Sequence, residues 1–374
     1  MDDPSARHGV QEDPGQGRLA ELRAQIDDTD RKLLRLLDQR IEYALQTARL
    51  KAAITDGGRE EQVLANVRAA AYGLLSDVFV AGLYRSIIDE SKRLQASRPR
   101  FGGFQGEHGA WSEMALERWD ANLIPVPCRS FADVFDGVAT AAFDRGIVPV
   151  ENTLGGSVVE VSDLLIATAL SIVGEIRAPV RQCLLALPGT VLADIRTVRS
   201  HPQALAQCRG YLAGHGIAME PYYDTAGAAR WLMFEGARGV GVIASPLAAT
   251  LYGLDVVAED VADHEENETR FVVLARQLHT GPADKGSIVL TTDDRSGALV
   301  QALGAFADHR VNLSRIESRP APGRRGQYTF LIDFAGDPGN DDVARALSAL
   351  GAQGVSYRLL GFYPSDPGPM PGRR

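Results

Sequence analysis

Two basic residues, Arg40 and Lys51, are spaced so that they could hold a small dianion between them. They lie in a stretch without proline or glycine, from Arg18 to about Ile54, whose apolar residues recur at helical spacing. Eleven residues of helix separate them, which puts both side chains within roughly 20° of one face and about 16 Å apart. Arg23 lies about 25 Å before Arg40 along the axis and on a different face. It could reach the same ligand only from the antiparallel helix of a second chain, and an overlong amphipathic helix needs such a partner.

Two more helices, over about residues 59–71 and 74–96, complete an all-helical segment. The motifs LAELRAQIDDTDRKLLRLLDQR, ARLK, DGGREEQVL and IIDESKRLQ, over residues 18–97, resemble the all-helical chorismate mutase domain, an intertwined dimer with sites shared between chains. The resemblance implies that Arg23 of the partner chain, Arg40 and Arg59 bind the substrate carboxylates. It also implies that Lys51 and Gln95 face the ether oxygen, that Glu60 holds the substrate hydroxyl, and that Asp56 and Ser91 complete the pocket.

The rearrangement of chorismate needs no nucleophile, acid or metal. Catalysis would come from holding the reactive conformer and from stabilising negative charge on the ether oxygen. Lys51→Ala should therefore abolish mutase activity and leave dehydratase activity nearly intact. The alternative is that these side chains are solvated charges on a long helix, which is the ordinary role of a single Arg or Lys. The match at all of these positions together favours the substrate site.

From Phe101 the sequence alternates short apolar strands with helices, which predicts βα units and mixed sheets. The stretches FQGEHGAWSEMA, FADVFDGV, GIVPVENTLGGSV, SHPQALAQC and NETRFVVLA, over residues 101–277, resemble prephenate dehydratase. The fold implied is two α/β lobes with a cleft between them. By this resemblance the cleft would be lined by Glu151, Asn152 and Thr153, by Ser200 and Gln207 opposite them, and by the closing motif Thr269–Arg270–Phe271.

Prephenate must lose hydroxide and carbon dioxide, so the site needs a donor to the departing hydroxyl. Thr269 is the expected donor or relay, acting through a hydrogen-bond network because an isolated hydroxyl is too weak an acid. Arg270 is expected to bind a substrate carboxylate through two hydrogen bonds. Glu151 could supply the proton if burial raises its pKa. A turn or helix cap explains each short motif taken alone, but the five stretches in order favour the dehydratase.

One position departs from this resemblance: Gln182 stands in VRQCLL, where related chains often carry histidine, and it is assigned no role. His108, His201 and His264 lack metal-ligand spacing and are interpreted as structural or surface residues. The glycines of GGFQGEHG do not form a dinucleotide-binding motif, and no P-loop pattern is present. We therefore expect no cofactor and no metal.

After the linker LHTGPADKG, the order of predicted elements is strand, helix, strand, strand, helix, strand, which is the ferredoxin-like pattern. The motifs GALVQAL and VNLSRIESRP resemble the ACT regulatory domain, over residues 286–364. The L-phenylalanine site implied by this resemblance consists of Gly297, Ala298, Leu299, Asn312, Glu317, Ser318, Arg319 and Pro320. A glycine at a helix start lets the carboxylate of an amino acid approach backbone N–H groups.

The composition and length fit a soluble globular protein of two or three domains. The chain has 374 residues, too many for one ordinary core, and 45% of them are hydrophobic. Its net charge of −9 argues against nucleic acid as the main partner. No membrane span or secretory signal is recognised, and three widely spaced cysteines predict a reducing, cytoplasmic location. Residues 1–17 and 365–374 are interpreted as flexible tails.

The fold predicted from these patterns has an all-α N-terminal domain, a two-lobed α/β central domain and a C-terminal ferredoxin-like βαββαβ domain. The predicted function is that of a homodimer, or a higher homo-oligomer, that converts chorismate to prephenate and prephenate to phenylpyruvate under feedback inhibition by L-phenylalanine. Two alternatives remain at this point. The helical segment could serve only dimerisation, or the whole chain could be a non-catalytic metabolite sensor.

Overall fold

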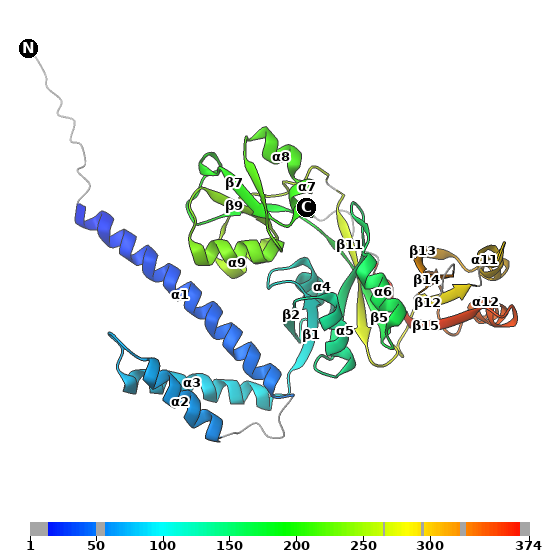
Figure 1. Ribbon diagram of the computed structural model, residues 1–374, viewed down its shortest axis with the longest axis horizontal. Coiled ribbons are helices and arrows are strands. Elements are labelled where there is room, and N and C mark those ends of the chain that lie inside the picture. Colours follow the sequence, from blue (N-terminus) through cyan, green and yellow to red (C-terminus); the bar gives the residue numbers. More distant parts are fainter. Residues whose placement is uncertain (1–13, 50–56, 265, 293–294, 322–326, 367–374) are drawn as a thin grey trace, which may run out of the picture. The chain divides into compact units, whose positions relative to one another are not determined.

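The computed structural model describes residues 14–49, 57–264, 266–292, 295–321 and 327–366 (Figure 1). Two compact units divide the chain, Met1–Gln95 and Ala96–Arg374. The described part of the first unit is helical, and the described part of the second holds three β-sheets. None of the helices in these ranges is both long enough and apolar enough to cross a membrane.

Long amphipathic helices form the first unit. They are α1 (Pro14–Thr47), α2 (Gly57–Ala70) and α3 (Asp77–Ala96). The predicted overlong helix is confirmed, although it ends at Thr47 and not near Ile54. Leu45, Val80 and Ile88 are buried, but most large apolar side chains of α1 are not. Between 43% and 59% of the surface remains exposed for Leu19, Leu22, Ile26, Leu33, Leu34 and Leu36.

The second unit begins with an α/β lobe, which we call lobe 1. Its strands are β1 (Arg100–Gln105), β2 (Leu123–Cys128), β3 (Arg145–Asn152), β4 (Gly156–Ser157), β5 (Ser171–Pro179) and β11 (Glu268–Ala275). Its helices are α4 (Trp111–Trp119), α5 (Phe131–Ala139) and α6 (Val159–Ala167). The strand order is β2-β1-β3-β11-β5, with β4 paired to β3. β11 comes from much later in the chain and lies between β3 and β5, antiparallel to both. Its residues are therefore in the interior of this sheet.

Lobe 2 is inserted between β5 and β11. Its strands are β6 (Cys183–Ala186), β7 (Thr197–Ser200), β8 (Ala218–Pro221), β9 (Val240–Ala244) and β10 (Asp255–Ala258), in the order β10-β6-β9-β7-β8. Its helices are the 3₁₀ turn η1 (Leu192–Asp194), α7 (Pro202–Gln207), α8 (Arg209–Gly214), α9 (Thr225–Glu235) and α10 (Pro246–Tyr252). Both sheets contain parallel and antiparallel pairs, so the prediction of two mixed α/β lobes is confirmed.

The C-terminal sheet has the predicted βαββαβ order. Its elements are β12 (Lys285–Thr292), α11 (Ala298–Asp308), β13 (Leu313–Pro320), β14 (Tyr328–Ala335), α12 (Asp341–Ala352) and β15 (Ser356–Tyr363), and the strand order is β13-β14-β12-β15. Ile288, Phe306 and Phe334 belong to the buried core of this sheet and its helices. β15 approaches β5 of lobe 1 so closely that a Cβ on Gly361 would collide with the carbonyl oxygen of Ile172. A glycine is therefore required where this sheet packs on lobe 1.

Candidate active sites

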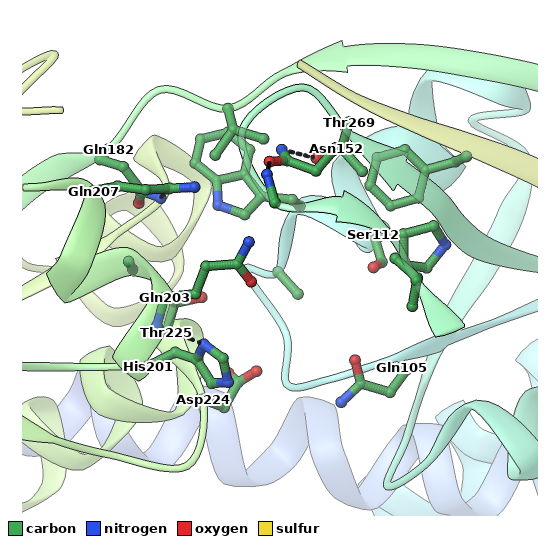
Figure 2. Close-up of a pocket in the computed structure, with 18 of the residues that line it drawn as sticks. Gln105, Ser112, Asn152, Gln182, His201, Gln203, Gln207, Asp224, Thr225 and Thr269 are labelled. Atoms are coloured by element: carbon green, nitrogen blue, oxygen red, sulfur yellow. Dashed lines mark hydrogen bonds between the residues drawn. The ribbon is translucent and has the colours of Figure 1, made fainter. Parts of the chain in front are cut away.

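A cavity of about 490 Å³ lies between lobe 1 and lobe 2 (Figure 2). Lobe 1 contributes Gln105, Ala110, Trp111, Ser112, Phe131, Pro149, Asn152, Gly155, Gly156, Ser157, Val158, Thr269 and Phe271. Lobe 2 and the segment that leads into it contribute Val180, Gln182, His201, Gln203, Ala204, Gln207, Tyr223, Asp224 and Thr225. The cavity is therefore large enough for a small metabolite and is polar on both sides.

Asn152 and Thr269 are paired in register on the adjacent strands β3 and β11, and both side chains face the cavity. The Nδ2 of Asn152 donates a hydrogen bond to Oγ1 of Thr269 at 2.9 Å. The Oδ1 of Asn152 accepts from the backbone N–H groups of Leu154 and Gly155, at 3.0 and 2.7 Å. Because Thr269 accepts from Asn152, its own proton is available for donation to another group. The sequence analysis had selected both residues.

Three further amides extend this arrangement away from Thr269. Asn152 Nδ2 also donates to Oδ1 of Asn267 at 2.7 Å, and Nδ2 of Asn267 donates to Oε1 of Gln207 at 3.2 Å. Nε2 of Gln182 donates to the same Gln207 oxygen at 2.9 Å. Asn267 is only 4% exposed, and the sequence analysis missed it although it starts the quoted stretch NETRF. Gln182, which had been given no role, lines the cavity.

Glu151 and Arg270 form the neighbouring register pair on β3 and β11, and neither lines the cavity. Successive residues of a strand point to opposite faces, so these two side chains point away from Asn152 and Thr269. Arg270 is 3% exposed and makes ion pairs with Glu175 at 2.7 Å and with Asp333 of β14 at 2.6 Å. The guanidinium of Arg270 is thus paired within the protein and away from the cavity, and its predicted role in binding a substrate carboxylate stays a prediction.

Glu151 likewise does not line the cavity, and its predicted role as a source of the proton stays a prediction. Its carboxylate lies 3.4 Å from the Nε atom of Arg315 on β13. Two other predicted cleft residues also lie outside the cavity lining. The Oγ1 of Thr153 donates to the backbone oxygen of Glu266 at 3.1 Å, and the buried Ser200 donates to the backbone oxygen of Ile243 at 2.6 Å. The hydroxyl of Thr153 thus holds the segment before β11, and that of Ser200 joins β7 to β9. Gln207, in contrast, lines the cavity as predicted.

His201 and Asp224 occupy the lobe 2 side of the cavity, and His201 had been interpreted as a structural or surface residue (Figure 2). The Nδ1 of His201 accepts from the backbone N–H of Gln203 at 3.3 Å, which caps α7. Asp224 caps α9 by accepting from the backbone N–H of Gly227 at 2.7 Å. Burial raises the pKa of Asp224, although hydrogen bonds to backbone N–H groups and the nearby His201 act in the opposite direction.

The described lining of the cavity contains no arginine or lysine. Two helices, α4 and α6, begin there instead, and their N-cap residues Ala110 and Val158 provide no side-chain hydrogen bond. The first backbone N–H groups of a helix have no partner within the helix, and the helix dipole adds positive potential at that end. These two helix starts are thus suited to bind carboxylates.

In the helical unit, α1 and α3 bring three predicted residues together. Arg40 Nη1 lies 3.4 Å from Oγ of Ser91, and Gln95 donates to the backbone oxygen of Ala44 one turn further along α1. Ser91 and Gln95 are buried, and the guanidinium of Arg40 lies 5.8 Å from the ring centre of Tyr84.

The other predicted residues of this unit lie apart from that cluster or beyond the described ranges. Glu60 on α2 accepts from Lys92 at 3.1 Å, and Arg59 donates to Gln62 at 2.8 Å. Arg23 is exposed on α1. Lys51 and Asp56 lie outside the described residues.

The predicted effector residues belong to two elements of the C-terminal sheet domain. Gly297 has a φ of +80° and is the N-cap of α11, where Ala298 is buried and Leu299 partly buried. Asn312, directly before β13, and Ser318, within β13, are both exposed. Two of the predicted residues instead contact lobe 1: Arg319 pairs with Asp163 of α6 at 2.7 Å, and Glu317 accepts from the Oγ of Ser157. Pro320 ends β13. β13 therefore reaches both the predicted effector site and the loop beside the cavity.

Three family models match consecutive parts of the chain: chorismate mutase type II over residues 22–96, prephenate dehydratase over 103–278 and the ACT domain over 286–352. The bifunctional chorismate mutase/prephenate dehydratase of Escherichia coli strain K12 is 33% identical over 373 residues, covering 93% of this chain and 96% of that protein. The chain belongs to this family. The helical unit is its mutase domain, lobes 1 and 2 form its dehydratase domain, and the C-terminal sheet is its ACT domain.

Two further relatives cover the dehydratase and ACT domains. Arogenate dehydratase 2 of Petunia hybrida is 40% identical over 282 residues, covering 71% of this chain and 72% of that protein. A solved structure of prephenate dehydratase in complex with L-Phe from Arthrobacter aurescens is 34% identical, with a TM-score of 0.65, and covers 71% of this chain and 89% of that one. The fold of lobes 1 and 2 with an attached ACT domain is thus that of a known dehydratase.

Proposed function

We propose that this chain converts chorismate to prephenate in its mutase domain and prephenate to phenylpyruvate in its dehydratase cavity, as a step of L-phenylalanine synthesis under feedback inhibition. The observation that carries the dehydratase half is the register pair Asn152–Thr269 at the cavity, because it leaves the proton of Thr269 free for donation. The three matching domains and the full-length relative support the bifunctional assignment.

In the dehydratase reaction, Thr269 donates a hydrogen bond to the ring hydroxyl of prephenate as its C–O bond breaks. The electron pair of the bond to the ring carboxylate becomes part of the aromatic ring, and carbon dioxide leaves. The departing hydroxide takes the proton of Thr269 and leaves as water, and the threonine oxygen regains a proton from solvent. Asn152 stabilises the negative charge that develops on Oγ1 of Thr269, because its Nδ2 already donates to that oxygen. Thr269 thus acts as a donor or relay within a network.

The substrate carboxylates are bound in this proposal by the starts of α4 and α6, in the role that sequence analysis had given to Arg270. Backbone N–H groups at a helix start bind an anion without a buried cation that would itself need compensation. Trp111, the first residue of α4, adds an indole Nε1 that is buried and has no hydrogen-bond partner among the described residues. A buried N–H normally has an acceptor, and a carboxylate oxygen of the substrate could fill that role.

A second substrate, arogenate, is favoured by the charge of the same cavity. Arogenate carries an α-ammonium group where prephenate has a keto oxygen, and it therefore has one negative charge fewer. The described lining has the carboxyl group of Asp224 and lacks Arg and Lys. The Petunia relative, which is 40% identical, is named arogenate dehydratase 2. Loss of water and carbon dioxide from arogenate gives L-phenylalanine directly by the same bond changes.

The mutase half of the proposal depends on a second copy of the chain. Arg40, Ser91 and Gln95 are adjacent, but Arg23 lies about 25 Å from Arg40 along α1. The exposed leucine and isoleucine stripe of α1 needs a cover, since a contiguous apolar surface of this size is costly in water. We propose that an antiparallel partner helix covers it and brings its own Arg23 to the site. Lys51 and Asp56 would complete that site.

Feedback inhibition is proposed from the ACT domain and from the L-Phe complex of the Arthrobacter relative. An effector shifts an equilibrium only if it binds the inactive state more tightly than the active state. The hydrogen bond between Ser157 and Glu317 connects the two sites directly, because Ser157 lines the cavity and Glu317 belongs to the predicted effector site.

The deciding experiment supplies chorismate to the purified full-length protein, with and without L-phenylalanine, and identifies the products by mass spectrometry. Phenylpyruvate and carbon dioxide that diminish with L-phenylalanine are the expected result. Chorismate left unchanged, with prephenate still consumed, would mean that the helical domain serves only dimerisation. Consumption of neither would leave a metabolite sensor. The expected cytoplasmic location stays a prediction for cell fractionation to test.

A further inference from the structure

The side-chain amides of Asn152, Asn267, Gln207 and Gln182 form a continuous chain along one wall of the dehydratase cavity, which we call the amide chain. It joins Thr269 in lobe 1 to the entry of lobe 2, and both ends line the cavity (Figure 2). Its members are far apart in sequence, since Asn152 and Asn267 are separated by 115 residues.

The direction of every hydrogen bond in the amide chain is determined at one end. The Oδ1 of Asn152 accepts from two backbone N–H groups, so this amide cannot be turned around. Its Nδ2 must therefore donate to an oxygen of Asn267, which leaves Asn267 Nδ2 to donate to an oxygen of Gln207. Gln182 must then donate its Nε2 to the same oxygen, because two facing oxygens would repel.

This fixed direction leaves an acceptor at the far end. The Oε1 of Gln182 is buried in a residue that is only 3% exposed, and it has no hydrogen-bond partner among the described residues. A buried acceptor without a donor destabilises a protein, so the occupant of the cavity is expected to supply one. Trp111 and Gln182 both line the cavity, and each has one buried side-chain atom without a partner among the described residues: the donor Nε1 of Trp111 and the acceptor Oε1 of Gln182.

A ligand that satisfies both groups needs an acceptor for Trp111 and a donor for Gln182. With the reacting hydroxyl placed at Thr269, a substrate whose side chain lies along the amide chain brings the end that does not react to Gln182. A keto acid has only acceptor oxygens there and leaves Gln182 unpaired. An α-amino acid has a carboxylate that accepts from Trp111 and an ammonium that donates to Gln182. The carboxyl group of Asp224 also lines the cavity, and its charge favours a ligand that carries a cationic group.

We propose that Gln182 is a specificity-determining residue of the dehydratase cavity, whose Oε1 accepts a hydrogen bond from the α-ammonium group of an amino-acid substrate. This inference rests on the proposed dehydratase function and deepens it: the cavity takes the cyclohexadienyl amino acid in addition to the keto acid. Gln182 selects between the two at the end of the substrate that does not react.

The test measures kcat/KM of the full-length protein for L-arogenate and for prephenate. Gln182→Met keeps the length of the side chain and removes its polar atoms. It should lower kcat/KM for L-arogenate about 10- to 100-fold relative to that for prephenate, which corresponds to about 1.4–2.8 kcal/mol. Gln182→Leu, which also lacks a polar side-chain atom, should shift the ratio in the same direction and serves if the Met variant does not fold.

Two matched variants separate specificity from general damage. Trp111→Phe removes the indole N–H that meets a carboxylate, which both substrates carry, so kcat/KM should fall for both and the ratio should stay within about threefold. Arg181→Ala changes the exposed neighbour of Gln182, which does not line the cavity, and should alter neither value. Mutase activity on chorismate and the thermal midpoint report whether each variant is folded.

The outcomes distinguish this inference from the function on which it rests. A wild-type protein that turns over prephenate but not L-arogenate overturns the inference alone. So does a Gln182→Met protein in which both kcat/KM values fall by the same factor, since Gln182 would then only position Gln207. A folded wild-type protein that turns over neither substrate overturns the proposed dehydratase function itself.

Discussion

Thr269 and Arg270 are consecutive residues of β11, yet their side chains lie in two opposite environments. Thr269, with its register partner Asn152, faces the cavity and is bonded to a network of neutral amides. Arg270, with its register partner Glu151, faces the ACT domain. The two faces of one pair of strands therefore serve substrate chemistry and domain attachment.

The face toward the ACT domain is built from buried charges. Arg270 pairs with Glu175 and Asp333, and Lys285 pairs with the same oxygen of Glu175 at 2.8 Å. Ser287 donates to Asp333, so the carboxylate has two kinds of partner. Burial by itself lowers the pKa of Arg270, but its anionic neighbours raise the pKa well above its ordinary value. This guanidinium remains charged at any pH at which the protein is folded.

The difference between the two faces teaches how one strand can carry two functions. Neutral amides orient a proton donor and tolerate the loss of one member, because each leaves only a dipole unpaired. Buried ions hold domains together strongly, but the removal of one leaves an uncompensated charge. Substitutions one residue apart should therefore have different consequences, one for turnover and one for stability.

The largest expected effect comes from Arg270→Met, which leaves Glu175 and Asp333 buried without this cation. The free energy of unfolding should fall by about 3–5 kcal/mol, because a broken buried pair costs far more than an exposed one. Urea denaturation followed by tryptophan fluorescence measures it. Arg319→Met is the matched control: its partner Asp163 is 54% exposed, so the loss should be about 0–1 kcal/mol. Equal losses in the two variants would remove the distinction between the faces.

Thr269→Ala should have the next largest effect, on turnover and not on stability. Removing one preorganised donor to a developing charge typically costs about 100- to 1000-fold in kcat. We expect a loss of that size with KM for prephenate within about threefold, measured by steady-state kinetics. Thr269→Ser keeps the hydroxyl and should retain most of the activity. Undiminished turnover in the alanine variant would exclude Thr269 from the mechanism.

Variants of the predicted effector site test inhibition by L-phenylalanine separately from the packing of the ACT domain on lobe 1. Ser318→Ala or Asn312→Ala should raise the concentration of L-phenylalanine for half-inhibition about 5- to 150-fold, the range of ordinary allosteric couplings. The uninhibited dehydratase rate should not change, because both side chains are exposed in the ACT domain and away from the cavity. Inhibition that persists unaltered in both variants would mean that the effector binds elsewhere.

The smallest effect expected is a dependence of the unfolding free energy on acid pH, caused by Asp333, the buried partner of Arg270. Burial raises the pKa of Asp333, but Arg270 and other cations lower it more, so the net pKa lies below its ordinary value. Asp333 therefore contributes stability that is complete above the unfolded value of about 3.9 and is lost as the pH falls through the folded pKa. The difference in unfolding free energy between wild type and Asp333→Asn should be constant from pH 5 to 7 and shrink below about pH 4. A constant difference throughout would contradict this assignment.

The residues that sequence analysis placed correctly share a local signal. Asn152, Gln207 and Thr269 were selected from short motifs, and all three line the cavity. Glu151 and Arg270 were selected from the same motifs and point the other way. The alternation of side chains along a strand was available in the sequence and would have separated both pairs, but it does not tell which face meets the cavity. That choice depends on where lobe 2 and the ACT domain pack.

The sequence by itself determined the order of the three domains, the long amphipathic helix and the βαββαβ pattern, because each depends on local periodicity and on turns encoded by neighbouring residues. Only the tertiary structure decided that Asn267 and Gln182 belong to one hydrogen-bond network with Asn152 and Thr269. It also decided that Arg270 pairs with Glu175 and Asp333. These contacts link positions many residues apart. Their geometry is set by the packing of lobes and sheets, which no local pattern specifies.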